Sequence, residues 1–582
     1  MGSRTKCADR PRLSRPISGT QSRSISRPLE HSSAPRRGRY RPSMAGDIRL
    51  ECSTISRNTQ SRGRVKMNLA ASLERHAAQS PDKLALVFKD RLYTYREYNE
   101  QANRVANGLR ELGIKRGDRV AIMMPNWPEF VFSVYGVLKL GAIAVGINVL
   151  FKSEETRYIL DNSQARAVLV ADHLLSVVQS TRPRLPGLEH VVVVHGEPSE
   201  GVLSYQALVD GSGPECCAVE LGPDERAVIF YTSGTTGVPK GAVHTHEALT
   251  VQMNIVSERF SVSQQDIIDT VMPIFSLSIL LNGPIIAVHN GCTCYLMERY
   301  NVVDYVRHIK EWEITLCFGA VPTIFVEVAR LPEEIGREVD FSSLRYITSG
   351  GAPMPADTRR EFEAKYNFRF MHAYGGTEGP IMVSTDPVDR ERKFDSVGMP
   401  LPHIKVKIVD DNDNEVPTGI IGEICSGPQT EGPYAGVYKM LKEYWRMPEA
   451  TAETLRGGYL HWGDLGYLDE DGYLYIVDRK KDMIIRGGLN VYPKELELVL
   501  YEDTRILECA VVGVPHERLG EVPKAYILLR AGAQATEQEF IDMIRNRLAK
   551  YKALEYVEFV QSFPRNAMGK ILKRELRDQT RA

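Results

Sequence analysis

The chain has 582 residues, too many for one hydrophobic core, so we expect two or more domains. Lysine plus arginine (73) nearly equals aspartate plus glutamate (74), so no whole-chain field favours nucleic acid or anionic lipid. A hydrophobic content of 43% is typical of a globular protein. Nine cysteines without paired CxxC spacing argue against a structural zinc or a disulfide framework, so we expect a reducing, cytoplasmic setting.

Residues 1–66 are rich in arginine and serine and show no sustained apolar period. Such a segment cannot bury enough surface to offset its ordering entropy, so we expect it to be disordered. It is open to three interpretations: an organellar transit peptide, an arginine-rich nucleic-acid arm, or a reading frame started too far upstream. We favour the third, because Met67 stands immediately before the first folded-looking sequence.

From Asn68 onward, helical and strand patterns alternate. Alternation of this kind predicts a large α/β domain, residues 67–478, with parallel-type sheets and flanking helices. In its first part, the expected helices are Leu73–Ala78 and Tyr95–Leu112. The expected strands are Arg119–Met123, Val168–Val170 and Val191–Val194.

Two apolar stretches are long enough to suggest a membrane span. Residues 130–151 contain Lys139 near their centre, where a lysine costs about 3 kcal/mol on insertion scales. Residues 271–288 are interrupted by two prolines, an asparagine and a glycine. We therefore expect both stretches to be buried helix and strand segments of an α/β protein, without a membrane span.

The stretch Tyr231–His246, YTSGTTGVPKGAVHTH, has the composition of a polyphosphate-binding loop. Such a loop needs glycines for close backbone approach, hydroxyls that donate, and a cation. An apolar run precedes it and helical spacing follows it, so we predict strand, loop and helix in that order. Its candidate phosphate-binding residues are Thr232, Ser233, Gly234, Thr235, Thr236, Gly237 and Lys240.

Two alternatives compete for this stretch. A Walker A loop would need glycine directly before the lysine and serine or threonine directly after it, whereas Pro239 and Gly241 occupy those places. A Ser/Thr/Gly surface linker is the simpler alternative, but the unbroken run of hydroxyl and glycine residues before Gly237 is not generic linker sequence.

Tyr374-Gly-Gly-Thr-Glu-Gly can serve a nucleotide. An aromatic ring can stack on a purine, Gly375 permits close approach, and the Thr377 hydroxyl can meet a phosphate. The Glu378 carboxylate can hold Mg²⁺, with Thr232 as a weaker ligand. Further along, Asp464 is the type of residue that binds ribose hydroxyls, and Arg479 can reach ribose or phosphate oxygens.

The last hundred residues predict a smaller α+β domain, residues 479–582. Residues 509–514 and 525–529 are expected strands, and residues 540–548 an expected helix. Lys570 follows a glycine in the loop beyond them. A lysine there is usually a solvated charge, and so is the run Asp478-Arg-Lys-Lys-Asp.

Taken together, these motifs resemble the adenylate-forming superfamily, which contains acyl-CoA synthetases, firefly luciferase and peptide-synthetase adenylation domains. The resemblance covers residues 68–582, with the motifs in family order. It implies that Gly350, Gly351 and Ala352 contribute backbone to the adenine site and that Lys570 reaches the reacting carboxylate and α-phosphate. It also implies a hinge at Lys481 and a CoA-channel role for Gly487 and Gly488. Ser276 departs from the family, which often has a histidine there.

The resemblance implies an ATP-dependent acyl-CoA ligase that uses ATP, Mg²⁺ and coenzyme A and forms an acyl-adenylate. A fatty acid is the expected substrate, because Ile274–Leu281 is apolar and has no lysine or arginine. The alternatives are an aryl-acid–CoA ligase and an acyl-AMP ligase that loads a separate carrier protein. Two further alternatives do not involve activation of a carboxylic acid. They are a phosphate-loop NTPase and a nucleic-acid-binding role for residues 1–66. The oligomeric state stays open, a homodimer being one expected assembly.

Overall fold

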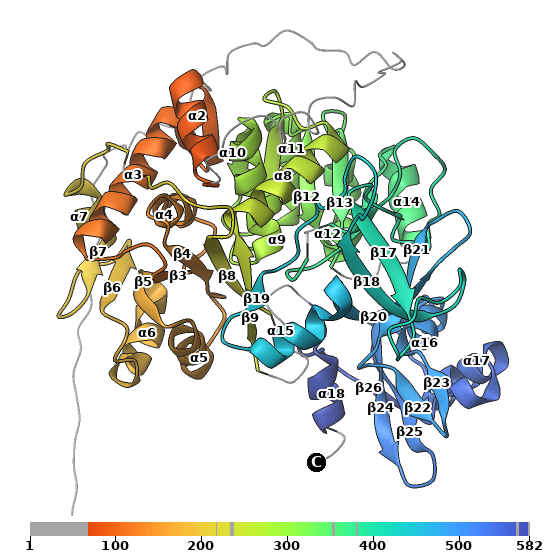
Figure 1. Ribbon diagram of the computed structural model, residues 1–582. Coiled ribbons are helices and arrows are strands. Elements are labelled where there is room, and N and C mark those ends of the chain that lie inside the picture. The colour runs from red at the N-terminus through yellow and green to blue at the C-terminus, as the bar shows by residue number, and fades with distance from the viewer. Residues whose placement is uncertain are drawn as a thin grey trace, which may run out of the picture. The chain divides into compact units, whose positions relative to one another are not determined.

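The structure, a computed structural model, describes residues 68–216, 218–232, 238–351, 356–379, 382–565 and 570–579. Residues 1–66, which we expected to be disordered, lie outside the described residues. So does the middle of the predicted phosphate loop, residues 233–237. The described chain forms four β-sheets with helices between and around them (Figure 1). The predicted α/β class, with parallel-type sheets and a smaller C-terminal part, is confirmed.

The first large sheet has eight strands in the order β19-β9-β8-β4-β3-β5-β6-β7, and its strands from β8 to β7 are parallel. In β3, Val120 and Ile122 lie in one hydrophobic core, while Ala121 and Met123 lie in another. Because alternate residues face opposite sides of a strand, the sheet is covered on both faces, as parallel sheets require. Its strands are β3 (Arg119–Met123), β4 (Ile143–Gly146), β5 (Ala165–Ala171), β6 (His190–Val194), β7 (Leu203–Ser204), β8 (Arg226–Thr232), β9 (Lys240–Thr245) and β19 (Glu443–Tyr444).

The second large sheet has nine strands in the order β16-β15-β14-β13-β12-β10-β11-β1-β2. Its centre, from β14 to β1, is parallel, and antiparallel strands close both edges. Its strands are β1 (Leu84–Phe88), β2 (Arg91–Thr94), β10 (Ile267–Thr270), β11 (Thr293–Leu296), β12 (Leu316–Ala320), β13 (Tyr346–Ser349), β14 (Met371–Tyr374), β15 (Ser384–Thr385) and β16 (Met399–Pro400).

Helices connect these strands and cover their apolar faces (Figure 1). They are α2 (Ala71–Gln79), α3 (Tyr95–Glu111), α4 (Pro128–Lys139), α5 (Ser153–Ser163), α6 (Leu175–Thr181), α7 (Tyr205–Asp210), α8 (His246–Phe260), α9 (Leu277–Leu280), α10 (Ile286–Asn290), α11 (Val302–Glu311), α12 (Pro322–Ala329), α13 (Glu333–Gly336), α14 (Ala356–Tyr366) and α15 (Pro448–Thr454). A π-helical turn, Leu281–Ile285, joins α9 to α10.

The two apolar stretches considered for a membrane span are buried elements of these layers. Residues 130–151 supply α4 and β4, and Lys139, at the end of α4, has no exposed side-chain surface. Its ammonium donates to Glu74 Oε1 at 2.7 Å and to Asn99 Oδ1 at 3.0 Å, which compensates the buried charge. In the second stretch, residues 271–276 form turns and residues 277–288 are helical, where strand segments were expected as well. Among the described residues, no helix is long and apolar enough to cross a membrane.

A four-stranded antiparallel sheet, β17-β18-β20-β21, was not predicted from the sequence. It comprises β17 (Ile404–Val409), β18 (Gly422–Pro428), β20 (Leu460–Leu468) and β21 (Leu474–Arg479). In its register Asp464 of β20 lies directly opposite Arg479 of β21. This pairing brings two candidate site residues together, although 15 positions separate them in the chain.

The C-terminal residues build a small sheet, β23-β22-β25-β24, with β26 paired to β25. Successive residues of β24 face opposite sides of the sheet: Val511 lies in one core and Val512 in another. Both cores consist only of residues from Ile484 onward. This part therefore has its own hydrophobic interior; the domain boundaries at 67 and 478 stay predictions. The elements are β22 (Ile484–Arg486), β23 (Leu489–Val491), α16 (Pro493–Leu500), β24 (Ile506–His516), β25 (Gly520–Leu529), α17 (Glu537–Arg547), β26 (Tyr556–Phe559) and α18 (Lys573–Gln579).

One local prediction was wrong. The strand predicted before the loop and the helix predicted after it are present as β8 and α8, but the stretch between them is not loop throughout, because residues 240–245 form β9, which returns antiparallel to β8 before α8 begins. Thr245 then caps α8 by accepting a hydrogen bond from the Ala248 amide. Lys240 therefore starts a strand, directly opposite Thr232 in the β8–β9 hairpin.

Candidate active site

Thr232 and Glu378 meet at the end of the β8–β9 hairpin. The Thr232 hydroxyl donates to Glu378 Oε1 at 3.1 Å, and the Tyr444 hydroxyl donates to the same oxygen at 3.0 Å. Lys240 Nζ lies 5.1 Å from the centre of the Tyr444 ring, within the range of a cation–π contact. Three of the predicted phosphate- and magnesium-binding residues are therefore neighbours, although residues 233–237 of the loop between Thr232 and Lys240 are not described.

The loop that carries Thr377 and Glu378 is fixed by its backbone. His244 Nε2 donates to the Thr377 carbonyl at 2.6 Å, and the Leu441 amide donates to the Glu378 carbonyl at 2.8 Å. Burial lowers the pKa of His244 to about 4, so the ring is neutral at pH 7 and the bond needs no charge.

The Trp462 ring packs against the same loop. A Cβ added at Gly376 or Gly379 would come within 2.9 Å or 2.6 Å of that ring, too close for any other residue. The two glycines therefore allow the indole to lie directly on the loop.

The Tyr374 end of the loop joins an ion pair between buried Asp464 and partly exposed Arg479. The Tyr374 hydroxyl donates to Asp464 Oδ2 at 2.6 Å, and Arg479 Nε lies 2.6 Å from Asp464 Oδ1. Burial and the Asp464 charge hold the pKa of Tyr374 well above its usual value, so it stays a donor. Only 4% of the Asp464 side chain is exposed, against 43% for Arg479. Stacking of the Tyr374 ring on adenine stays a prediction.

The predicted adenine turn begins beside this strand. The Gly350 amide donates to the Ala320 carbonyl at 3.1 Å, and a Cβ on Gly350 would lie 2.9 Å from the carbonyl oxygen of Ala373. Gly351 follows with a φ of +78°. The turn thus lies against the backbone that leads into Tyr374 and Gly375. Ala352 lies outside the described residues.

Lys570 belongs to the charge cluster around Asp464. Its side chain reaches solvent, yet the protein packed around it lowers its pKa to about 8. Arg479 and Lys481 lower the pKa further, while Asp464 and Asp482 act in the opposite direction. The predicted adenylation lysine is therefore close enough to Asp464 and Arg479 for their charges to be felt. Residues 566–569, just before it, lie outside the described chain.

Gly487 and Gly488 form the two-residue turn between β22 and β23. Both have positive φ, +58° and +84°, as a tight primed hairpin turn requires. Both are exposed, as is Lys481 at the predicted hinge. The next residue, Asp482, pairs with Arg577 of α18, so the last described helix is tied to this junction. The CoA-channel and hinge roles stay predictions.

The residues around Glu378 fit Mg²⁺ as ATP-using enzymes bind it. Mg²⁺ usually takes one or two protein oxygens and completes its shell with water and substrate phosphates. Both hydrogen bonds to Glu378 end on Oε1, and no hydrogen bond from the described residues reaches Oε2. No group of three or more His, Cys, Asp or Glu side chains that could hold a metal occurs in the described ranges, at Glu378 or away from it. The donor set thus suits a metal brought with the nucleotide.

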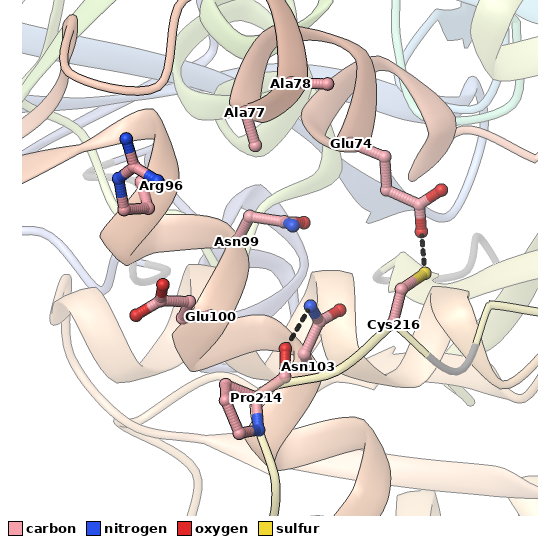
Figure 2. Close-up of a pocket in the computed structure, with 9 residues that line it drawn as sticks. All are labelled: Glu74, Ala77, Ala78, Arg96, Asn99, Glu100, Asn103, Pro214 and Cys216. Carbon is pink, nitrogen blue, oxygen red and sulfur yellow. Dashed lines mark hydrogen bonds between the residues drawn. The ribbon is translucent and has the colours of Figure 1, made fainter.

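A surface pocket of about 390 Å³ lies apart from these residues (Figure 2). It is formed by α2, α3 and the loop at Pro214 and Cys216. Glu74, on its wall, accepts from the Cys216 thiol at 2.9 Å and also pairs with buried Lys139. Its carboxylate is therefore engaged by the protein itself, and none of the predicted site residues lines this pocket.

Sequence reasoning missed three residues of the site, namely Tyr444, His244 and Trp462. His244 lies inside the stretch Tyr231–His246 and Trp462 stands two positions before Asp464, so their place beside predicted site residues was the signal that could have found them. Tyr444 lies in a two-residue strand without a motif, and its proximity to Glu378, 66 positions away, appears only in the folded chain.

Comparison with known proteins identifies related chains. A model of the AMP-binding enzyme family matches residues 73–435, and a model of the AMP-binding enzyme C-terminal domain matches residues 495–570. A long-chain-fatty-acid–CoA ligase of Escherichia coli is 31% identical over 88% of this chain and 95% of its own length. The long-chain-fatty-acid–CoA ligase FadD13 of Mycobacterium tuberculosis is 36% identical over 88% of this chain and 98% of its own length.

A solved structure shares the fold as well. The anthranilate CoA ligase AuaEII in complex with anthranoyl-AMP superposes with a TM-score of 0.81 and is 29% identical. The alignment covers 88% of this chain and 97% of that one.

Proposed function

Because the chain belongs to the family of AMP-binding enzymes, we propose that it is an ATP-dependent acyl-CoA ligase. It converts a carboxylic acid, ATP and coenzyme A into acyl-CoA, AMP and pyrophosphate. One observation carries the proposal: Thr232, Glu378 and Lys240 meet around Tyr444, which brings together a hydroxyl, a carboxylate and an ammonium of the kinds that a magnesium-bound polyphosphate needs.

The first step makes the acid a better acyl donor. A carboxylate oxygen attacks the α-phosphorus of ATP, the bond to the bridging oxygen of the β-phosphate breaks, and pyrophosphate leaves with that electron pair. In this proposal Lys570 offsets negative charge at the carboxylate and α-phosphate, and Lys240 holds the departing phosphates. Glu378 and Thr232 would hold Mg²⁺, which neutralises polyphosphate charge when bound.

The second step transfers the acyl group to sulfur. The CoA thiol loses its proton as its sulfur attacks the acyl carbon; the bond between that carbon and the phosphate oxygen breaks, and AMP leaves. Lys570 must withdraw before the thiol can arrive from the same side. We propose that the C-terminal part moves about Lys481 and that the Gly487–Gly488 turn then helps to form the pantetheine channel.

A fatty acid is the proposed substrate. The relatives from Escherichia coli and Mycobacterium tuberculosis are long-chain-fatty-acid–CoA ligases, and the segment Ile274–Leu281 has buried aliphatic side chains and no cation for a second carboxylate. The alternative is an aryl acid, supported by the fold shared with the anthranilate CoA ligase. A carrier-protein thiol in place of CoA is the third alternative.

A pyrophosphate-release screen over fatty, aryl and branched acids, with and without CoA, tests this function. We expect AMP and pyrophosphate in equal amounts with a preferred acid, and acyl-CoA only when CoA is present. ADP and orthophosphate would instead indicate a phosphate-loop NTPase. Failure to form AMP with any acid would refute the proposal.

We also propose a cytoplasmic enzyme without a nucleic-acid partner, acting as a homodimer. The six described cysteines are all free, which suits a reducing compartment. Light scattering of the purified protein measures the assembly, and a molar mass near 65 kDa would exclude the dimer.

A further inference from the structure

Tyr444 touches both charged groups on the phosphate side of the candidate site. Its hydroxyl donates to Glu378 Oε1 at 3.0 Å, and its ring lies 5.1 Å from Lys240 Nζ. A carboxylate and an ammonium are thus held by the two ends of one side chain.

The hydroxyl fixes which carboxylate oxygen stays available. Thr232 donates to Glu378 Oε1 as well, so that oxygen receives two hydrogen bonds. Across the described chain, Oε2 receives none, and it is the atom free to meet a cation. A tyrosine hydroxyl is protonated near neutral pH, so it can donate this bond.

The ring is held rigidly enough to position a lysine. Tyr444 is 5% exposed and pairs with Ala242 across β19 and β9. Its amide donates to Thr451 Oγ1 at 2.9 Å, and the next amide, of Trp445, donates to the Gly241 carbonyl at 2.7 Å. Because Gly241 directly follows Lys240, this pairing fixes the lysine backbone as the ring attracts its ammonium.

We propose that Tyr444 is a positioning residue for acid activation, which turns Glu378 Oε2 toward Mg²⁺ and holds Lys240 for the leaving phosphates. The proposal rests on the proposed function, because it requires a nucleotide-borne metal at Glu378. It assigns two separable tasks to one residue: the hydroxyl serves the metal, and the aromatic face serves the lysine.

Two substitutions separate these tasks. Tyr444→Phe keeps the ring and removes the hydroxyl, whereas Tyr444→Leu removes both. At a fixed saturating ATP concentration, we expect Tyr444→Phe to raise the Mg²⁺ concentration for half-maximal pyrophosphate release about tenfold, with little change in the KM for the acid. Tyr444→Leu should show the same rise in Mg²⁺ requirement and a further fall in kcat.

Tyr95→Phe is the matched control. Tyr95 is also a buried tyrosine, and its hydroxyl donates to the Cys292 carbonyl at 2.6 Å, far along the chain from the phosphate side. This variant also loses one buried hydrogen bond, so a general loss of stability would appear in it as well. Its Mg²⁺ requirement should equal that of the unmodified protein.

The outcomes are distinguishable. An unmodified protein that forms no AMP with any acid refutes the proposed function itself. If the unmodified protein is active and Tyr444→Phe needs the same Mg²⁺ concentration as the unmodified protein, the role of the hydroxyl is refuted. Equal kcat in Tyr444→Phe and Tyr444→Leu refutes the role of the ring. An equal rise in Tyr95→Phe would show that the effect is only structural and also overturns the inference.

Discussion

The two ends of the loop from Tyr374 to Gly379 are built differently. At the Tyr374 end, both oxygens of Asp464 are engaged by the protein, one by Tyr374 and the other by Arg479. At the Glu378 end, both hydrogen bonds converge on a single oxygen. A carboxylate with both oxygens engaged maintains the shape of a site, whereas one held by a single oxygen keeps its acceptor capacity for a ligand. The comparison predicts that the first end governs nucleotide affinity and the second governs the metal.

The largest expected effect comes from removing the positive charge of Lys570. Lys570→Ala should reduce acyl-AMP formation on the order of 10³-fold, because one preorganised donor to developing charge is lost. Thioester formation from synthetic acyl-AMP should be spared, which single-turnover assays of each half-reaction measure. Lys552→Ala removes a lysine of the C-terminal part that is 19% exposed and pairs with Glu495; because it is not among the candidate site residues, it should change neither rate more than about twofold. Equal loss of both half-reactions in Lys570→Ala would contradict the assigned role.

Glu378→Gln removes the carboxylate at the Glu378 end of the loop. The amide keeps the shape but loses the charge, so we expect about a 100-fold loss of pyrophosphate release and a higher Mg²⁺ requirement. Glu443→Gln is the control, because Glu443 lies next to Tyr444 but pairs with Arg226 at the surface. Its Mg²⁺ titration should match that of the unmodified protein, and an unchanged titration in Glu378→Gln would place the metal elsewhere.

Asp464→Asn removes the carboxylate that is engaged at the Tyr374 end of the loop. It leaves the Arg479 guanidinium without its ion-pair partner, so we expect the KM for ATP to rise roughly tenfold or more at an unchanged Mg²⁺ requirement. Tyr374→Phe removes one hydrogen bond from the same group and should raise that KM about two- to tenfold. A higher Mg²⁺ requirement in Asp464→Asn would show that the two ends do not act separately.

The smallest expected effect is a pH dependence that sharpens the comparison. The pKa of Lys570 is lowered to about 8, first by the protein packed around it and then by Arg479, so its ammonium is present below pH 8 and lost above it. We expect kcat/KM for pyrophosphate release to fall about fivefold from pH 8 to pH 9. Arginine keeps its charge in this range, so Lys570→Arg should flatten the profile whatever its absolute rate. The same fall in that variant would assign the titration to another group.

The sequence predicted those parts of the molecule that depend on local pattern. β3 coincides with the expected strand at Arg119–Met123, because a continuous apolar run is what a sheet covered on both faces requires. β9 was missed, since residues 240–245 have no two-residue alternation and pair with β8 only through the fold. Tertiary pairing overrode the local pattern at that point.

The site followed the same rule. Tyr374, Glu378 and Asp464 were found because each stands in a motif with a chemical rationale. The contacts among these residues, and Tyr444 itself, were not found, because the hydrogen bond between Tyr444 and Glu378 and the charges acting on Lys570 arise from segments far apart in the chain. Residue type predicted the capacity for chemistry, and only the fold supplies the neighbours that direct it.

The indole of Trp462 has a practical consequence. It is one of four tryptophans in the chain and lies directly on Gly376 and Gly379, on either side of Thr377 and Glu378. Its fluorescence is therefore an intrinsic optical reporter of that loop. Stopped-flow emission could time the arrival of nucleotide separately from bond making, without any attached dye.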